Sequence, residues 1–276
     1  MFQKPMEKFK AHACTLPGVM AVEATSNRSL SRHTHDQFGI GLVLHGAQDS
    51  TSGRGQMRAV KGDLITVNVN KPHDGRAIDD QPRSWCMLYF EPELVAAVAK
   101  DMGHSAGSEW HHPVLKHAQA VRAFTRLYTV LTDVHAVAGR DVAEQELFEI
   151  LAPLLGNEQR VSVGPVHPLS KEIMQAKARI DAQPQEPVSL AELAADAGWS
   201  RFHFLRSFKA ATQLPPHAYQ LQRQMQLARR LILAGYSVAH AAVMAGFVDQ
   251  SHLTRRFVAC YGFTPGAIAN LRKSTS

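Results

Sequence analysis

The chain has 276 residues, of which 45% are hydrophobic and 20% charged, a composition typical of globular proteins with room for two domains. No apolar run approaches the roughly 18 residues that a membrane span needs, and the N-terminus lacks the apolar core of a signal peptide, so we expect a cytoplasmic protein. The cysteines lie far apart, which excludes a disulfide framework or a paired-cysteine metal site and predicts inert, buried thiols: Cys14, Cys86 and Cys260.

The net charge of +6 is unevenly distributed along the chain. Residues 165–276 contain 13 Lys and Arg against 6 Asp and Glu, whereas residues 1–164 are close to neutral. Such an asymmetry indicates that the C-terminal part of the chain meets a polyanion and that the N-terminal part does not.

The region from about residue 20 to residue 90 is predicted to form the strands of a small barrel or sandwich. Short runs rich in β-branched, Leu and aromatic residues lie at 39–46, 64–69 and 85–90, and Gly, Pro, Asp and Asn separate them.

Helices follow this region. A short one is predicted at 91–103, a second within 113–137 and a third at 141–155. The second helix carries apolar residues at spacings of three and four: Val121, Phe124, Tyr128, Leu131 and Val134. This stripe predicts an amphipathic helix that packs against the barrel.

Two histidines separated by one residue lie in the segment RHTHDQF, residues 32–38. On a strand, residues i and i+2 point to the same face, so the side chains of His33 and His35 converge. Converging imidazoles can hold a metal ion, or they can line a pocket that binds a small molecule. At this point the sequence leaves both interpretations open.

Residues 156–168 contain several Pro, Gly and Asn residues and predict an interdomain linker. We place the linker at 159–169, between domains at 1–158 and 170–276. The C-terminal domain is predicted to be helical throughout.

The C-terminal domain contains a duplicated segment. Two stretches about 48 residues apart share residue types at positions i, i+3, i+4 and i+8: Leu190, Leu193, Ala194 and Gly198 match Val238, Ala241, Ala242 and Gly246. Each copy predicts a short helix, a turn at the glycine and a second helix. These are two helix-turn-helix units, at 188–212 and 236–262, with Ser200 and Asp249 as the N-caps of the second helices.

The second helix of each unit is predicted to have one apolar and one basic face. The apolar faces carry Phe204 with Phe208 and Leu253 with Phe257. Arg and Gln on the opposite faces could hydrogen-bond base edges and phosphates if the helices enter the major groove of DNA. A helix of about 18–20 residues after Pro215–Pro216 joins the units and, at near 30 Å, would hold the second helices about one duplex turn apart.

The C-terminal hundred residues resemble the arabinose-regulator (AraC/XylS) family of bacterial transcription factors. The resemblance rests on LAELAADAGWSRFHFLRSFKAAT, RQMQLARRLI and GFVDQSHLTRRFVACYGFTPGAI in that order. Gln213 departs from the family, which usually has glycine there, and Ala269-Asn270 replaces a common Tyr-Arg. By this resemblance, with Arg206 as the foremost base contact, the residues that face DNA are Arg201, Phe202, Leu205, Arg206, Lys209, Gln250, Ser251, His252 and Arg255.

The N-terminal region resembles the cupin-like sensor domain of many members of that family, through HTHDQFGIGLVLHG and VKGDLITVNVNKPHDGR. His73 then joins His33 and His35 in a set that is sufficient for zinc or iron. The glutamate usual in the cupin pattern is missing, because positions 39 and 40 are Gly and Ile. We therefore favour contact with a small effector over a metal ion or a purely structural role. The expected effector contacts are Arg32, His33, His35, Asp36, His73, Asp74 and Arg76.

The predicted fold is α+β with two domains: an N-terminal cupin-like β-barrel with flanking helices, and a C-terminal all-α domain of two helix-turn-helix units joined by a long helix. The predicted function is a transcriptional regulator that binds operator DNA and a small-molecule effector, without catalytic residues, a cofactor or a membrane partner. The resemblance implies activation through RNA polymerase. It also implies a homodimer formed by the helix within 113–137, because Leu127 widens the apolar face of this helix. The competing hypothesis is a metal-dependent cupin enzyme with an attached DNA-binding domain.

Overall fold

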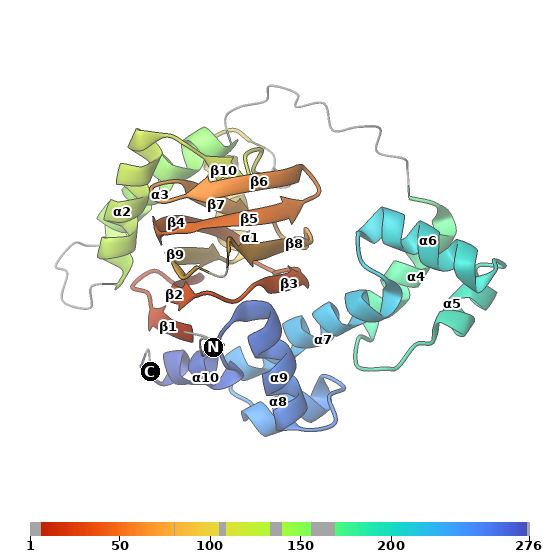
Figure 1. The fold of residues 1–276 in the computed structure, drawn as a ribbon. Helices are drawn as coiled ribbons and strands as arrows, with labels where there is room; N and C mark the ends of the chain where they lie inside the picture. The colour runs from red at the N-terminus through yellow and green to blue at the C-terminus, as the bar shows by residue number, and fades with distance from the viewer. Residues whose placement is uncertain (1–6, 80, 105–108, 133–139, 156–168, 275–276) are drawn as a thin grey trace. The chain divides into compact units, whose positions relative to one another are not determined.

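A computed structural model of the chain describes residues 7–79, 81–104, 109–132, 140–155 and 169–274 (Figure 1). The chain divides into two compact units between residues 162 and 163. The fold is α+β with two domains, as predicted: β-sheets with flanking helices in the first unit, helices alone in the described part of the second. The predicted linker lies outside the described residues.

The strands of the first unit form two antiparallel sheets. The larger sheet has the order β1-β2-β9-β4-β7-β10, with β1 (Glu7–Ala13), β2 (Val19–Ser26), β9 (Arg83–Phe90), β4 (Phe38–His45), β7 (Leu64–Val67) and β10 (Val114–Leu115). The smaller has the order β3-β8-β5-β6, with β3 (Leu30–His33), β8 (His73–Ala77), β5 (Ala47–Ser52) and β6 (Gly55–Val60). The strands predicted at 39–46, 64–69 and 85–90 are confirmed as β4, β7 and β9.

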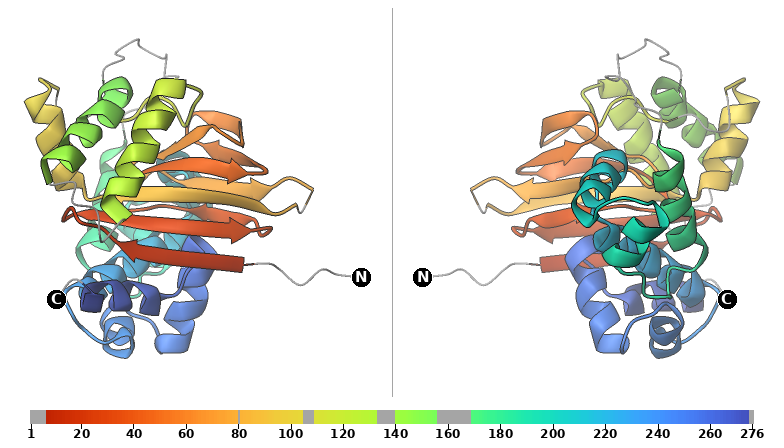
Figure 2. Two further views of the ribbon diagram at one scale, coloured as in Figure 1. Left: turned by 90° about the vertical axis from the view of Figure 1, so that its left-hand side faces the viewer. Right: turned by 90° about the vertical axis from the view of Figure 1, so that its right-hand side faces the viewer.

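Three helices cover one face of the larger sheet (Figure 2): α1 (Pro92–Asp101), α2 (Ala118–Thr132) and α3 (Arg140–Leu155). Alternate residues of β4 and β9, such as Ile40 and Leu88, share one core with Phe124 and Leu127 of α2. Successive residues of a strand point to opposite faces, which is why every second side chain faces the helices. The apolar stripe of α2 therefore packs mainly in the core of its own domain, whereas Val121 and Tyr128 are only half-buried.

The helix predicted within 113–137 begins later than expected. Val114 and Leu115 form β10, which pairs with Ile65 and Leu64 of β7, and α2 starts at Ala118. The open edge of the larger sheet supplies ladder hydrogen bonds that the sequence pattern does not reveal. Residues 133–137 lie outside the described residues.

The second unit consists of helices in its described part: α4 (Lys171–Ala182), α5 (Leu190–Asp196), α6 (Arg201–Thr212), α7 (Pro216–Leu233), α8 (Val238–Met244), α9 (Gln250–Tyr261) and α10 (Pro265–Ser274). The predicted N-caps are confirmed: the Ser200 hydroxyl accepts from the His203 amide at 3.2 Å, and the Asp249 carboxylate accepts from the His252 amide at 2.6 Å. None of the described helices is long and apolar enough to cross a membrane.

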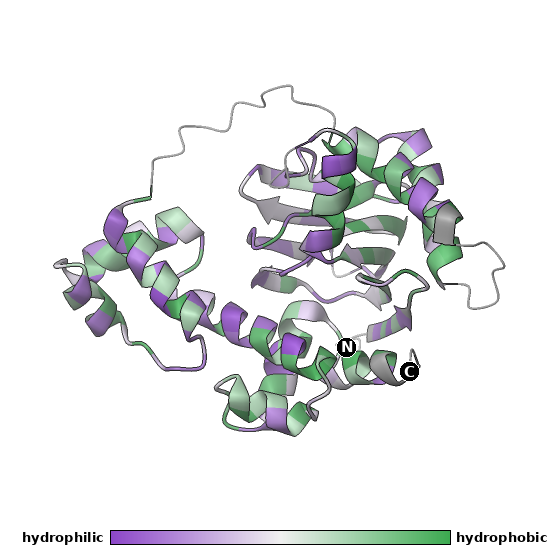
Figure 3. Ribbon diagram, turned by 180° about the vertical axis from the view of Figure 1, so that it is seen from behind, coloured by the Kyte–Doolittle hydropathy of each residue, from purple (hydrophilic) through white to green (hydrophobic). Residues whose placement is uncertain are grey.

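The long helix α7 has 18 residues, as the sequence predicts, and it buries polar side chains. Hydrophilic residues lie along much of its length in Figure 3. Gln220, Gln222, Gln226 and Arg229 are each less than 10% exposed. Buried polar groups need hydrogen-bond partners, so α7 must be tied by specific bonds to the helices around it.

All three cysteines are free thiols, with Cys86 and Cys260 buried and Cys14 half-buried. Burial raises the pKa of the Cys86 thiol to about 11 and that of Cys14 to about 12. Both groups therefore stay protonated at neutral pH, which fits inert core thiols.

Candidate functional site

Helices α6 and α9 each have one buried and one solvent-exposed face. Phe204 and Phe208 of α6, and Leu253 and Phe257 of α9, have no exposed surface. The opposite faces expose Arg201, Phe202, Arg206, Lys209, Gln250, Ser251, Arg255 and Arg256, and Leu205 is half-buried. Phe202 is 75% exposed, which is unusual for an aromatic side chain and costs hydration free energy unless a partner covers it.

The histidines near the start of these helices pack on aromatic residues of the preceding turns. The His203 ring stacks on Trp199 with ring centroids 4.5 Å apart, and the half-buried His252 lies against Phe247 at 5.4 Å. The same contact between a histidine and an aromatic ring therefore recurs in both helix-turn-helix units. His252, predicted to face DNA, is therefore partly committed to its own turn.

Asp181 of α4 anchors α7 to the first helix-turn-helix unit. Its carboxylate accepts hydrogen bonds from Tyr219 Oη at 2.7 Å, Arg223 Nε at 2.6 Å and Lys177 Nζ at 2.7 Å. Partial burial would raise the pKa of the Asp181 carboxyl, but the hydrogen bonds from Lys177 and Tyr219 and the charge of Arg223 outweigh it, so the pKa is lowered.

Other contacts tie α7 to both units. Gln220 Nε2 donates to the Pro184 carbonyl at 3.1 Å, in the loop before α5, and Gln222 Nε2 lies 3.7 Å from Cys260 Sγ of α9. Gly246, the turn glycine of the second helix-turn-helix unit, approaches the same loop closely. A Cβ at this position would lie 2.7 Å from the Gln185 carbonyl oxygen. The two helix-turn-helix units are therefore held by polar bonds to α7 and by direct backbone contact.

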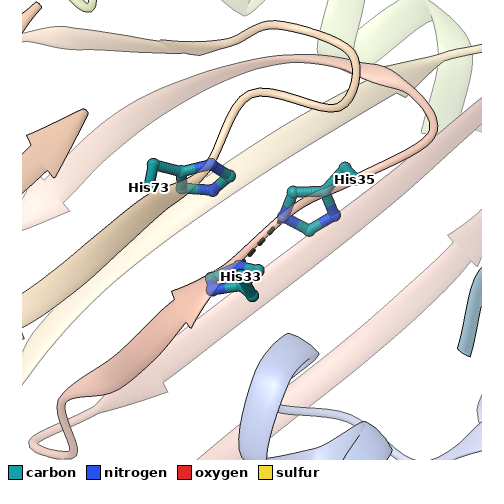
Figure 4. A group of neighbouring side chains, drawn as sticks. All are labelled: His33, His35 and His73. Atoms are coloured by element: carbon teal, nitrogen blue, oxygen red, sulfur yellow. Dashed lines mark hydrogen bonds between the residues drawn. The ribbon is translucent and has the colours of Figure 1, made fainter. Parts of the chain in front are cut away.

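In the N-terminal domain, the structure brings His33, His35 and His73 together (Figure 4). His33 ends β3 and pairs across the smaller sheet with His73, the first residue of β8. One ring nitrogen from each of the three side chains lies within 4.8 Å of the others, and the Nε2 atoms of His33 and His35 are 3.1 Å apart. His33 and His35 are buried and His73 is half-buried.

Backbone carbonyls fix the orientation of two of these rings. His33 Nδ1 lies 2.7 Å from the Ser31 oxygen, and His73 Nδ1 lies 3.1 Å from the Lys71 oxygen. Because a carbonyl oxygen only accepts, Nδ1 carries the proton in both rings, and the lone pair of the neutral ring is on Nε2. Burial lowers the pKa of His33 to about 3, and a proton on the neighbouring His73 would lower it further, so this imidazole is neutral at physiological pH.

Three of the other predicted effector contacts bond to Thr51 of β5, and Arg32 and Asp74 also act electrostatically on His73. Arg32 Nη1 donates to the Thr51 carbonyl at 3.4 Å, Asp74 Oδ1 accepts from the Thr51 amide at 2.7 Å, and Arg76 Nη2 lies 3.4 Å from Thr51 Oγ1. Because side chains alternate along a strand, Asp74 and Arg76 of β8 point to the opposite face from His73 and lie around β5. Asp36 is half-buried just beyond β3.

Comparison with known proteins assigns families to both units. Residues 16–152 match the AraC-like ligand-binding domain, and residues 193–270 match a helix-turn-helix domain. The chain belongs to the AraC family of transcriptional regulators. It is an AraC-type DNA-binding regulator with an N-terminal ligand-binding domain.

Curated relatives of this AraC-type chain are also regulators. It is 25% identical over 228 residues to the uncharacterized HTH-type transcriptional regulator YbfI of Bacillus subtilis, covering 80% of each chain. It is 27% identical over 253 residues to the MmsAB operon regulatory protein of Pseudomonas aeruginosa, covering 86% of this chain and 76% of that protein. A crystal structure of ToxT from Vibrio cholerae has the same fold, with a TM-score of 0.54 at 7% identity over 96% of this chain and 97% of that one.

Two features of this AraC-family chain escape sequence reasoning. The approach of Gly246 to Gln185 joins residues far apart in the sequence, and only the turn glycine hints at it. The buried glutamines of α7 resemble ordinary surface residues in the sequence, although their clustering in QLQRQMQ was a usable signal.

Proposed function

We propose that α6 and α9 are the two DNA-reading helices of this regulator, and that each enters a major groove on the same side of the duplex. The observation that carries the proposal is the pair of exposed, basic helix faces fixed to one rigid spacer, α7, whose 18 residues span about 27 Å. Successive major grooves on one side of DNA are roughly 34 Å apart. Arg206 and Arg255, which are exposed and correspond in the two units, suit bidentate contacts to guanine.

The central test replaces Arg206 with Ala in the full-length protein and measures binding to DNA selected in vitro by the wild-type chain. Loss of one base contact should weaken binding by about 1–3 kcal/mol, roughly 5- to 150-fold, and relax preference at one base pair. Lys171→Ala is the matched control, because it removes an exposed positive charge from α4 instead of α6. An unchanged affinity and footprint for Arg206→Ala would remove that residue from the interface.

The exposure of Phe202 offers a second test. Phe202→Ala removes an aromatic side chain that contributes nothing to a core, so the free energy of unfolding should stay within about 0.5 kcal/mol of wild type. DNA affinity should fall, because an apolar contact with a thymine methyl group is lost. Equal losses of stability and binding would instead place Phe202 in the fold of the domain.

We further propose that the effector of the N-terminal domain binds at the end of the barrel that carries His33, His35 and His73. Replacing His33 and His35 together with Gln should leave DNA binding without effector unchanged and abolish the response to effector. A thermal-shift screen of small metabolites against wild-type and variant protein identifies compounds that depend on these side chains. A compound that stabilises both equally binds elsewhere.

The remaining expectations concern partners and setting. We propose a non-catalytic, cytoplasmic protein that activates transcription through RNA polymerase; regulators among its relatives support this role and give no support to the cupin-enzyme alternative. We also propose a homodimer formed through α2, whose Val121 and Tyr128 are only half-buried. In vitro transcription and sedimentation of the full-length protein test these two points.

A further inference from the structure

Of the groups in the described part of the first unit, the three histidines make the most specific arrangement. Their side chains come from β3, the segment after it and the start of β8, and their rings face one another: centroids lie 4.9 Å apart for His33 and His35, 4.5 Å for His33 and His73, and 5.2 Å for His35 and His73. Among described residues, no other group of three metal-binding side chain types comes this close.

We infer that His33, His35 and His73 bind one divalent transition-metal ion, with Zn²⁺ as the first candidate. This inference deepens the proposed ligand site, because it names the chemical class of what the histidines hold. Neutral imidazole nitrogens are preferred ligands of Zn²⁺, Ni²⁺, Cu²⁺ and Fe²⁺, whereas Mg²⁺ and Ca²⁺ prefer oxygen.

The distances fit this chemistry. Two nitrogens bound at 2.0–2.1 Å to one tetrahedral ion are about 3.3 Å apart, and the Nε2 atoms of His33 and His35 are separated by 3.1 Å. A metal ion between the two nitrogens would replace this contact, with the proton of His35 moving from Nε2 to Nδ1 so that both Nε2 lone pairs face the ion. The third nitrogen, from the half-buried His73, lies within 4.8 Å of the other two, so its ring must move closer to complete the set.

The surroundings of the rings also match a metal site. Metal-binding histidines usually donate their other N–H to a carbonyl or carboxylate, which fixes the tautomer. His33 and His73 make this bond to the carbonyls of Ser31 and Lys71.

The surroundings of the rings suit a small occupant. The ring of Tyr89 packs on His35 with ring centroids 5.1 Å apart, so an aromatic side chain already covers one of the three histidines. Three protein ligands also leave a coordination position that a small donor molecule could occupy.

The test titrates Co²⁺, a spectroscopic stand-in for Zn²⁺, into tag-free, full-length protein that has been stripped with a chelator. We expect one equivalent to bind and produce ligand-field absorption bands of a low-symmetry, nitrogen-coordinated site, and Zn²⁺ to abolish them by displacement. His33→Gln, His35→Gln and His73→Gln should each weaken binding by at least about 100-fold. His45→Gln, which changes an exposed histidine of the same domain, should bind as wild type does.

Wild-type protein provides an arm that does not depend on the folding of any variant. X-ray absorption of the Zn²⁺-loaded protein should show scattering from three imidazoles, and Zn²⁺ should raise the unfolding temperature of the N-terminal domain. Fewer than two imidazoles, or full affinity in the His73→Gln variant, would overturn the inference. Because DNA binding is not measured in these experiments, their failure would leave the DNA-reading role of α6 and α9 standing, as Arg206→Ala tests that role separately.

Discussion

Gln213 holds an unfavourable backbone conformation at the C-terminal end of α6. Its φ of 60° lies in the left-handed region. The equivalent position of the second helix-turn-helix unit, after α9, is Gly262, with a φ of 81°. The Gln213 amide still donates to the Lys209 carbonyl at 2.8 Å, so the helix ends in the ordinary way. The departure from the family glycine thus changes the energy of the turn and not its geometry.

Replacing Gln213 with Gly should therefore stabilise the C-terminal domain. Relief of left-handed strain of roughly 1–2 kcal/mol is partly offset by the greater freedom of glycine in the unfolded chain, which leaves a gain of about 0.5–1 kcal/mol. Urea unfolding of the full-length protein measures the change. Gly262→Ala should shift stability in the opposite direction, and a loss of stability in Gln213→Gly would show that the glutamine side chain makes contacts worth more than the strain.

Helix α7 and the turns inside the two helix-turn-helix units determine how α6 and α9 are held. Gly198 and Gly246 are equivalent turn residues, with φ values of 67° and 85°. Nothing lies within 4 Å of a Cβ placed on Gly198, whereas one on Gly246 would lie 2.7 Å from the Gln185 oxygen. Both glycines therefore have a left-handed backbone, but only Gly246 contacts the loop that precedes the first helix-turn-helix unit.

This difference predicts unequal effects of alanine. Gly198→Ala should cost about 1 kcal/mol from the left-handed conformation. Gly246→Ala should cost more, since the Gln185 loop must also move, and it should weaken binding to a two-site DNA more than binding to a single half-site. Denaturant unfolding and gel-shift titration of both variants provide the comparison. Equal effects would mean that the contact at Gln185 does not hold the units together.

The Asp181 cluster is a second element-to-element link, and it depends on pH. The folded-state pKa of Asp181 is lowered from its ordinary value of 3.8, because the bonds from Lys177, Tyr219 and Arg223 outweigh the effect of burial. A lowered carboxyl pKa adds stability that is fully present above the unfolded-state pKa and is lost as the pH falls through the folded-state pKa.

Asp181→Asn should therefore destabilise the second unit near pH 7 by about 1–3 kcal/mol, through loss of charge-assisted hydrogen bonds. Its deficit relative to wild type should shrink as the pH falls below about 4, because the unfolded chain takes up a proton there while the folded carboxylate still resists one. Urea unfolding at a series of pH values measures this difference. A deficit that is constant down to acidic pH would assign the effect to packing rather than to charge.

Across the chain, each compact unit has a hydrophobic core of its own. The core of the first unit joins β4 and β9 to helices α1, α2 and α3, and the first helix-turn-helix unit packs Phe204 and Phe208 against Tyr219 of α7. Separate cores permit separate unfolding, which allows a ligand to act on one unit without stabilising the other.

Calorimetry of the full-length protein should accordingly resolve two unfolding transitions. Phe208→Ala, which removes a fully buried ring, should lower only the transition of the C-terminal unit, by about 3–5 kcal/mol. Zn²⁺ should raise only the transition of the N-terminal unit. If either change moves both transitions together, the units unfold as one cooperative body.

Local patterns in the sequence were enough for most elements of the second unit. Its caps, turn glycines and apolar spacings involve residues only a few positions apart, so a repeated pattern such as that of Gly198 and Gly246 predicts both helix-turn-helix units. The start of α2 was missed because Val114 and Leu115 pair with a strand about fifty residues earlier in the chain, and no local pattern encodes the open edge of a sheet.

The sequence alone therefore predicted the two-domain α+β organisation and the duplicated helix-turn-helix module, since both depend on short-range spacing, and its resemblance to a known family indicated the function. Folding in three dimensions decided which side chains meet. It brought His73 to His33 and His35, turned Arg32, Asp74 and Arg76 toward Thr51, and used the apolar stripe of α2 in the domain core. The physical reason is that strand pairing and burial join residues distant in the chain, and the alternation of each strand then determines which side chains share a face.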